Sequence, residues 1–167
     1  KDCARLKDLG FTHFMGLNAD YGKIWDAGKP TEASAPQTVA STKAALDDAL
    51  AAGLGILGYL YPGRWAQCKP EFQRVNEQGQ PYPKPTDVCG LFPEVKQYCA
   101  NVGASVAQTY GAFPALQWVD VHSEVRDGSR PCFHTHDRAA FKQFAGFDMP
   151  AFPASVVHLR GIPYASI

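Results

Sequence analysis

The chain has 167 residues, of which 46% are hydrophobic and 19% are charged, with 16 basic and 16 acidic side chains. This composition is typical of about one globular domain and excludes a long disordered chain. A formal net charge of zero gives no electrostatic reason to bind nucleic acid or an anionic membrane, and no apolar stretch approaches the roughly 20 residues that cross a bilayer. We therefore expect no nucleic acid and no membrane among its partners.

The first predicted elements are the end of a helix and a short strand. Residues 1–10 have the pattern of the last turns of a helix, with Leu6 and Leu9 facing inward and Gly10 as a left-handed stop. The apolar and aromatic run 11–17 follows directly and predicts a strand. Because the chain opens inside a helical pattern and closes without a cap, we expect it to be a fragment of a longer protein.

The first helix-to-strand repeat covers residues 34–61. Ser34 is the expected cap of a helix over 37–52, and Gly53 is expected to end that helix. The apolar run 54–61 follows at once and has the pattern of a strand that is buried on both faces. The inward face of the helix is expected to carry Val39, Ala45, Leu46, Ala49 and Leu50.

The second repeat has the same order. Pro93 opens a helix over 94–110, and Gly111 closes it before a buried strand over 115–122. A last helix follows, with Asp137 as its expected cap. The inward side chains of these two helices are expected to be Val95, Cys99, Val102, Val106, Phe141 and Phe144.

This order of elements predicts an α/β fold, with parallel strands and covering helices. The strand-to-helix stretches 18–36, 61–92 and 122–136 are long, whereas the helix-to-strand links are short. Long loops on one side place the working face at the carboxyl ends of the strands. No glycine-rich phosphate loop follows any strand, so a partial (β/α)8 TIM barrel is favoured over a nucleotide-binding doubly wound sheet.

Two stretches carry a resemblance to a known group of enzymes. Residues 116–124, Leu-Gln-Trp-Val-Asp-Val-His-Ser-Glu, with the helix end 108–115 before them, resemble the fourth strand of (β/α)8 glycoside hydrolases of the clan that contains the family 42 β-galactosidases and the family 5 glycanases. Residues 132–141, Cys-Phe-His-Thr-His-Asp-Arg-Ala-Ala-Phe, are similar to their segment Cys-x-Cys-x-x-Cys-Arg-x-x-Phe. The resemblance implies that residues 1–167 cover about strands 2 to 4 of a single catalytic barrel domain.

The resemblance also implies a function, the hydrolysis of a glycosidic bond in an oligo- or polysaccharide. Glu124 would be the general acid/base, and the nucleophile would lie in the remainder of the polypeptide, outside this chain. Burial beside Trp65 or Trp118 would keep such a carboxyl partly protonated, whereas the alternative role for Glu124 is an ion pair with a nearby arginine. The residues expected to bind the carbohydrate substrate are Asn18, Tyr59, Tyr61, Arg64, Trp65, His122 and Arg126. We expect Asn18, Tyr61 and Glu124 to share one cleft.

Ser123 leaves a second function open. The related enzymes have Asn before their acid/base Glu, and a serine cannot offer the donor and the acceptor of an amide together. The alternative is therefore a barrel that binds carbohydrate or serves as a scaffold without catalysis.

The five cysteines, Cys3, Cys68, Cys89, Cys99 and Cys132, leave the redox compartment open, with a slight preference for a secreted setting. Either a Cys89–Cys99 disulfide or a buried thiol on each fits the spacing. His134 and His136, which follow Cys132, replace zinc-type cysteines of the similar segment. A zinc-bearing interaction module is a third alternative, although it needs a fourth donor such as Cys68. The favoured hydrolase requires no cofactor and no metal.

Overall fold

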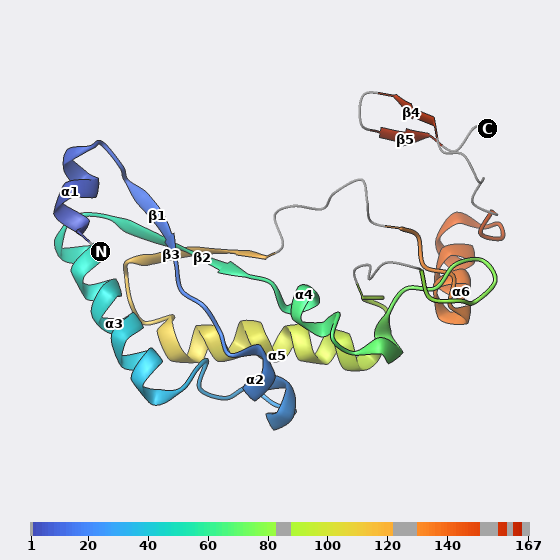
Figure 1. Cartoon of the computed structure of the whole chain (residues 1–167), viewed down its shortest axis with the longest axis horizontal. Coiled ribbons are helices and arrows are strands. Elements are labelled where there is room, and N and C mark those ends of the chain that lie inside the picture. Colours follow the sequence, from blue (N-terminus) through green and yellow to red (C-terminus); the bar gives the residue numbers. More distant parts are fainter. Residues whose placement is uncertain (1, 83–87, 122–129, 151–156, 160–161, 165–167) are drawn as a thin grey trace. The chain divides into compact units, whose positions relative to one another are not determined.

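Figure 1 shows the computed structural model of this chain. It describes residues 2–82, 88–121, 130–150, 157–159 and 162–164. In chain order the elements are α1 (Cys3–Asp8), β1 (His13–Gly16), α2 (Tyr21–Ala27), α3 (Pro36–Ala51), β2 (Gly55–Leu60), α4 (Pro62–Ala66), the 3-10 helix η1 (Pro70–Phe72), α5 (Pro93–Tyr110), β3 (Leu116–Val121), α6 (Thr135–Ala145), β4 (Val157–Leu159) and β5 (Ile162–Tyr164). The two compact units are Lys1–Trp65 with Lys96–Ser123, and Ala66–Val95 with Glu124–Ile167.

The first unit is built on a three-stranded parallel sheet in the order β1-β2-β3 (Figure 1). Met15 pairs with Leu57, and Leu57 pairs in turn with Trp118. The prediction of three parallel strands, adjacent in this order, is confirmed. The described chain is therefore of the α/β class, and its parallel sheet is smaller than the eight strands that close a TIM barrel.

Each parallel pair is connected through a helix. The long helix α3 lies between β1 and β2 in the chain, and α5 lies between β2 and β3. Figure 1 shows both helices on the same side of the sheet, as the short helix-to-strand links predict. Gly53 makes the turn after α3 with a φ of 66°, a left-handed conformation that a residue with a side chain adopts only with strain.

The core consists of apolar side chains from these helices and from the central strand β2. Leu46 and Ala49 of α3 are fully buried, and Ile56 and Leu60 of β2 are almost fully buried. On α5 the buried apolar residues are Val95, Tyr98, Val102, Val106 and Tyr110. Their spacing of three or four residues is that of one helix face. Cys99, which was expected inward, is only half-buried, because Tyr98 occupies the stripe beside it.

Strand β3 differs from the prediction that it is buried on both faces. The exposed fractions of Trp118, Val119 and Val121 are 53%, 38% and 59%. In the described sheet β3 pairs with β2 alone, so it is an edge strand. An apolar run indicates that a strand can be covered, but it does not say whether the covering element is present.

Four helix residues that were expected in the core are exposed instead, namely Ala45 in the middle of α3 and three large apolar residues. Leu9, Leu50 and Phe144 are exposed by 66%, 47% and 93%. Each lies at or near the carboxyl end of its helix, where the periodic face runs past its packing partners. Phe141, by contrast, remains half-buried and contacts the Phe147 ring edge-on at 5.5 Å between centroids.

Two helix starts also differ by a residue or more from prediction. Helix α3 has Ala35 as its N-cap in place of Ser34, with Pro36 in the first helical position. Helix α6 has His134 as its N-cap, so Asp137 lies inside the first turn. A carboxylate there interacts favourably with the positive end of the helix dipole.

Candidate metal centre

The second unit contains a cluster of sulfur, nitrogen and carboxylate atoms. Cys89, Cys132, His134 and Asp137 each offer one ligand atom, and these four atoms all lie within 4.8 Å of one another. Both cysteines are buried, whereas His134 and Asp137 are partly exposed. One donor comes from a segment far away in the sequence, and the other three come from the start of α6 and the residues before it.

Backbone hydrogen bonds from a single segment hold these donors in place. The amide of Cys89 donates to the carbonyl of Phe72 at 2.8 Å. The amide of Phe133, next to Cys132, donates to the carbonyl of Val75 at 3.0 Å. Residues 72–75 therefore bring the two cysteines to the same place without help from a regular sheet.

Two arginines fix the loop that carries Cys132. The guanidinium of Arg138 donates to the carbonyls of Phe133 and Glu77 at 3.2 and 3.0 Å, and it also lies over the Phe133 ring. The guanidinium of Arg74 donates to the carbonyl of Arg130 at 2.6 Å. These charge-assisted hydrogen bonds limit the freedom of the loop and so favour one arrangement of the donor atoms.

The distances between donors are close to those of a tetrahedral metal site. Cys89 Sγ lies 3.2 Å from Asp137 Oδ2, Cys132 Sγ lies 2.9 Å from His134 Nδ1, and His134 Nδ1 lies 3.5 Å from Asp137 Oδ2. A tetrahedral zinc ion with ligands at about 2.0–2.3 Å needs donor atoms about 3.3–3.8 Å apart. The donor set of two thiols, an imidazole and a carboxylate therefore fits zinc in its chemistry. The 3.5 Å distance lies in this range and the 2.9 and 3.2 Å distances lie below it, so these two donor pairs would move apart around an ion.

Burial sets the protonation of the two thiols. Burial, together with the hydrogen bond to Asp137, raises the pKa of Cys89 to about 12. The pKa of Cys132 is also raised, again mainly by burial. At neutral pH and without a metal both thiols are therefore protonated, and the Cys89 thiol donates to the Asp137 carboxylate. A bound cation would displace these protons.

His136 stands beside the four donors. Its Nε2 lies 3.3 Å from Cys89 Sγ and 3.3 Å from Asp137 Oδ2. Its ring stacks on that of His134, with centroids 5.0 Å apart, and the Phe92 ring meets both imidazoles edge-on. His136 is thus packed against the cluster rather than turned away from it.

The local sequence pattern predicts only part of this cluster. Cys132, His134 and His136 were the predicted zinc donors, with Cys68 as the suggested fourth. Cys132 and His134 are among the four, whereas His136 and the exposed Cys68 are not. The missed donors are Cys89 and Asp137. Counting along Cys-x-Cys-x-x-Cys from Cys132 places the third position on Asp137, a signal that could have found it.

No local pattern points to Cys89, because its role depends on a contact between distant segments. Cys89 had been considered as a disulfide partner of Cys99. All five cysteines are free thiols in this structure; Cys89 is the buried thiol of the other alternative, whereas Cys99 is only half-buried.

Comparison of this chain with protein family models, with curated proteins and with solved structures finds no match in any of the three. Within the described part of the chain, no helix combines the length and the apolar character that crossing a membrane requires.

Three of the residues expected to bind sugar, Asn18, Tyr59 and Tyr61, lie at or just beyond the carboxyl ends of β1 and β2. The side-chain oxygen of Asn18 accepts a hydrogen bond from the amide of Ala19 at 2.9 Å. Tyr59 and Tyr61 contact each other edge-on, with centroids 4.3 Å apart. The amide of Tyr61 donates to the Tyr21 hydroxyl at 2.7 Å, which ties the end of β2 to α2.

The two other described residues of this set, both on α4, differ in their exposure and packing. Arg64 is exposed on α4. Trp65 packs in an aromatic cluster with Trp25 and Tyr98, at centroid distances of 5.6 and 5.3 Å. The remaining candidates, His122, Glu124 and Arg126, lie outside the described residues. The shared cleft of Asn18, Tyr61 and Glu124 therefore stays a prediction.

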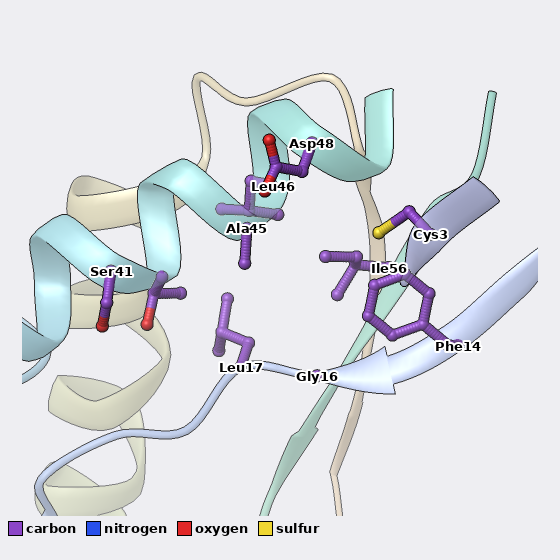
Figure 2. Close-up of a pocket in the computed structure, with 10 residues that line it drawn as sticks. Cys3, Phe14, Gly16, Leu17, Ser41, Ala45, Leu46, Asp48 and Ile56 are labelled. Atoms are coloured by element: carbon purple, nitrogen blue, oxygen red, sulfur yellow. The ribbon is translucent and has the colours of Figure 1, made fainter. Parts of the chain in front are cut away.

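A separate pocket of about 220 Å³ lies between the sheet and α3 (Figure 2). Figure 2 shows Phe14 and Ile56 from the sheet facing Ala45 of α3, with the sulfur of Cys3 turned into the space between them. Ser41 of α3 lies at the other end in Figure 2, and Thr42 also lines the pocket. The lining contains none of the residues predicted to bind sugar, so this pocket gives no support to that site.

Proposed function

We propose that this chain binds a structural zinc ion through Cys89, Cys132, His134 and Asp137. The observation that carries the proposal is the convergence of the four ligand atoms within 4.8 Å. Thiolate, imidazole and carboxylate are the ligands that zinc takes in proteins. Four protein donors leave no open position, which is typical of a structural zinc and not of a catalytic one.

Such an ion would connect two segments that have few other contacts through helices or strands. Cys89 lies before α5, and the other three donors lie at the start of α6. Zinc binding contributes about 10–16 kcal/mol in small zinc-finger peptides, because the site does not exist in the unfolded chain. We therefore expect the metal to stabilise the second unit more than its apolar contacts alone can.

The test is elemental analysis of the purified chain together with thermal unfolding. We expect about one zinc per chain, the stoichiometry of a closed four-ligand site. Cys89→Ala and Asp137→Ala should lower the zinc content, whereas Cys68→Ala, which removes an exposed thiol outside the cluster, should not. A strong chelator should lower the unfolding temperature of the wild type but not that of Cys89→Ala. An unfolding temperature that does not respond to zinc in the wild type would contradict the proposal.

We also propose a function for the larger protein to which these residues would contribute, hydrolysis of glycosidic bonds by a (β/α)8 barrel. The supporting observation is that β1, β2 and β3 run parallel, so that their carboxyl ends lie at one edge of the sheet. Asn18 and Tyr61 follow two of these ends, and Glu124 comes shortly after the third, at Val121. In α/β barrels this edge carries the catalytic groups. Glu124 is the proposed general acid/base and a carbohydrate the proposed partner.

The test of this second proposal is Glu124→Gln in the complete protein, which keeps the size of the side chain but removes its transferable proton. General acid/base catalysis contributes about 10²–10⁴-fold, so turnover of an unactivated glycoside should fall by about that factor. A substrate whose leaving group needs no protonation should lose far less in the glycosylation step. Glu94→Gln, in the exposed first turn of α5, is the matched control. Unchanged turnover in Glu124→Gln would favour the carbohydrate-binding or scaffold barrel instead.

A further inference from the structure

His136 is the most solvent-accessible group of the metal cluster. Its side chain is 38% exposed, compared with 21% for His134 and 14% for Asp137. Cys89 and Cys132 are exposed by only 2% and 8%. An ion that arrives from solvent therefore meets His136 before it can meet either sulfur atom.

The ring nitrogen of His136 also lies close to the other donor atoms. Nε2 is 3.3 Å from Cys89 Sγ and 3.3 Å from Asp137 Oδ2, so it already faces two of the four donors. Stacking on His134 and the edge-on contact with Phe92 hold the ring in that orientation. The ring nitrogen is therefore placed where an ion that approaches Cys89 and Asp137 would meet it.

His136 is nevertheless outside the closed set. The four mutually close donors are Cys89, Cys132, His134 and Asp137, and a structural zinc takes four ligands. A fifth donor at the solvent side can bind an incoming ion only until the inner four are all in place. Its contribution would then be to the rate of binding and not to the final complex.

We infer that His136 is a loading ligand, a residue that binds a divalent ion together with Asp137 at the surface of the cluster and passes it to the buried thiols. This inference rests on the proposed zinc site. It assigns to His136 a role in metal uptake that is separate from the role of the four final ligands. Imidazole and carboxylate suit such a step, because both bind zinc or cobalt readily and neither has to cross a buried region.

The experiment follows cobalt(II) binding to the metal-free full chain by stopped-flow absorbance, using the thiolate-to-cobalt charge-transfer band. His136→Phe removes the ring nitrogen but keeps a ring for stacking on His134 and Phe92. It should slow association by about tenfold, the lower end of what groups beside metal ligands contribute. Dissociation should slow by a similar factor, so that the Kd stays within about threefold of wild type. Zinc(II), followed by competition with a chromophoric chelator, should give the same pattern.

Two further variants make the result specific. His136→Cys places another metal donor at the same position and should restore fast association. Thr135→Ala changes the exposed neighbouring residue and should bind as the wild type does. Circular dichroism of each metal-free variant checks folding, and His136→Ala replaces His136→Phe if the larger ring disturbs the cluster.

The possible results separate this inference from the zinc proposal. Association of His136→Phe at the wild-type rate would overturn the loading role while leaving the zinc site intact. A large loss of affinity with unchanged association would also overturn it, because His136 would then be a permanent ligand. A wild-type chain that binds neither cobalt nor zinc would overturn both proposals.

Discussion

Zinc affinity is expected to fall steeply as the pH is lowered from 8 to 6. The pKa of Cys89 is raised to about 12 by burial, and that of Cys132 is raised as well, so both thiols stay protonated over this whole range when no metal is bound. Binding as thiolates then releases two protons, and lower pH favours the protonated, metal-free form. The sign is therefore fixed: affinity rises with pH and is lost as pH falls.

The magnitude follows from the two thiols. One proton displaced changes the apparent affinity tenfold per pH unit, or about 1.4 kcal/mol, so two protons give about 100-fold per unit and about 10⁴-fold between pH 8 and pH 6. For Cys89 alone, a pKa of about 12 means that at pH 7 about 7 kcal/mol of the zinc–thiolate interaction is offset by deprotonation. The site should therefore bind zinc far more weakly at neutral pH than its donor set would otherwise allow.

The assay is a competition titration against a chromophoric chelator at pH 6, 7 and 8 and constant ionic strength. Cys89→Ser should reduce the dependence to about tenfold per unit, since only one thiol proton is then displaced. Cys68→Ser should behave as the wild type, because this thiol lies outside the cluster. A wild-type affinity that changes by less than about tenfold per pH unit would refute binding through two buried thiols.

Further predictions concern the first unit. Leu46→Ala removes a fully buried side chain and should lower the free energy of unfolding by about 2–5 kcal/mol. Leu50→Ala on the same helix, at a site 47% exposed, should lower it by less than about 1 kcal/mol. Equal losses in a urea titration would show that the helix face is misassigned. Gly55→Ala would place a methyl group against the His13 ring and should destabilise the chain by about 1–3 kcal/mol, while Gly63→Ala, which meets open space, should change stability little. A neutral Gly55→Ala in thermal unfolding would mean that the His13 and Gln117 side chains move aside at this position.

The amino-acid sequence by itself determined the features that depend on local periodicity. The apolar runs near 54–61 and 115–122, each directly after an amphipathic helix, are sufficient to predict parallel strands joined by crossovers, because few other arrangements bury such runs. Gly10 and Gly53 were recognisable as helix stops, and both have positive φ angles. The inward stripe of α5 was right at three positions, Val95, Val102 and Val106, because these repeat along one helix face.

Tertiary structure alone decided which surfaces are covered and which distant residues meet. The side chains of β3 have the composition of a buried strand, yet Trp118 and Val121 are exposed because only one neighbouring strand pairs with β3 in the described sheet. Likewise, Cys89 has no motif of its own. It joins Cys132 and Asp137 because hydrogen bonds to the backbone of residues 72–75 hold both segments, and a sequence pattern records the residues of one segment but not the loop closure that brings two segments together.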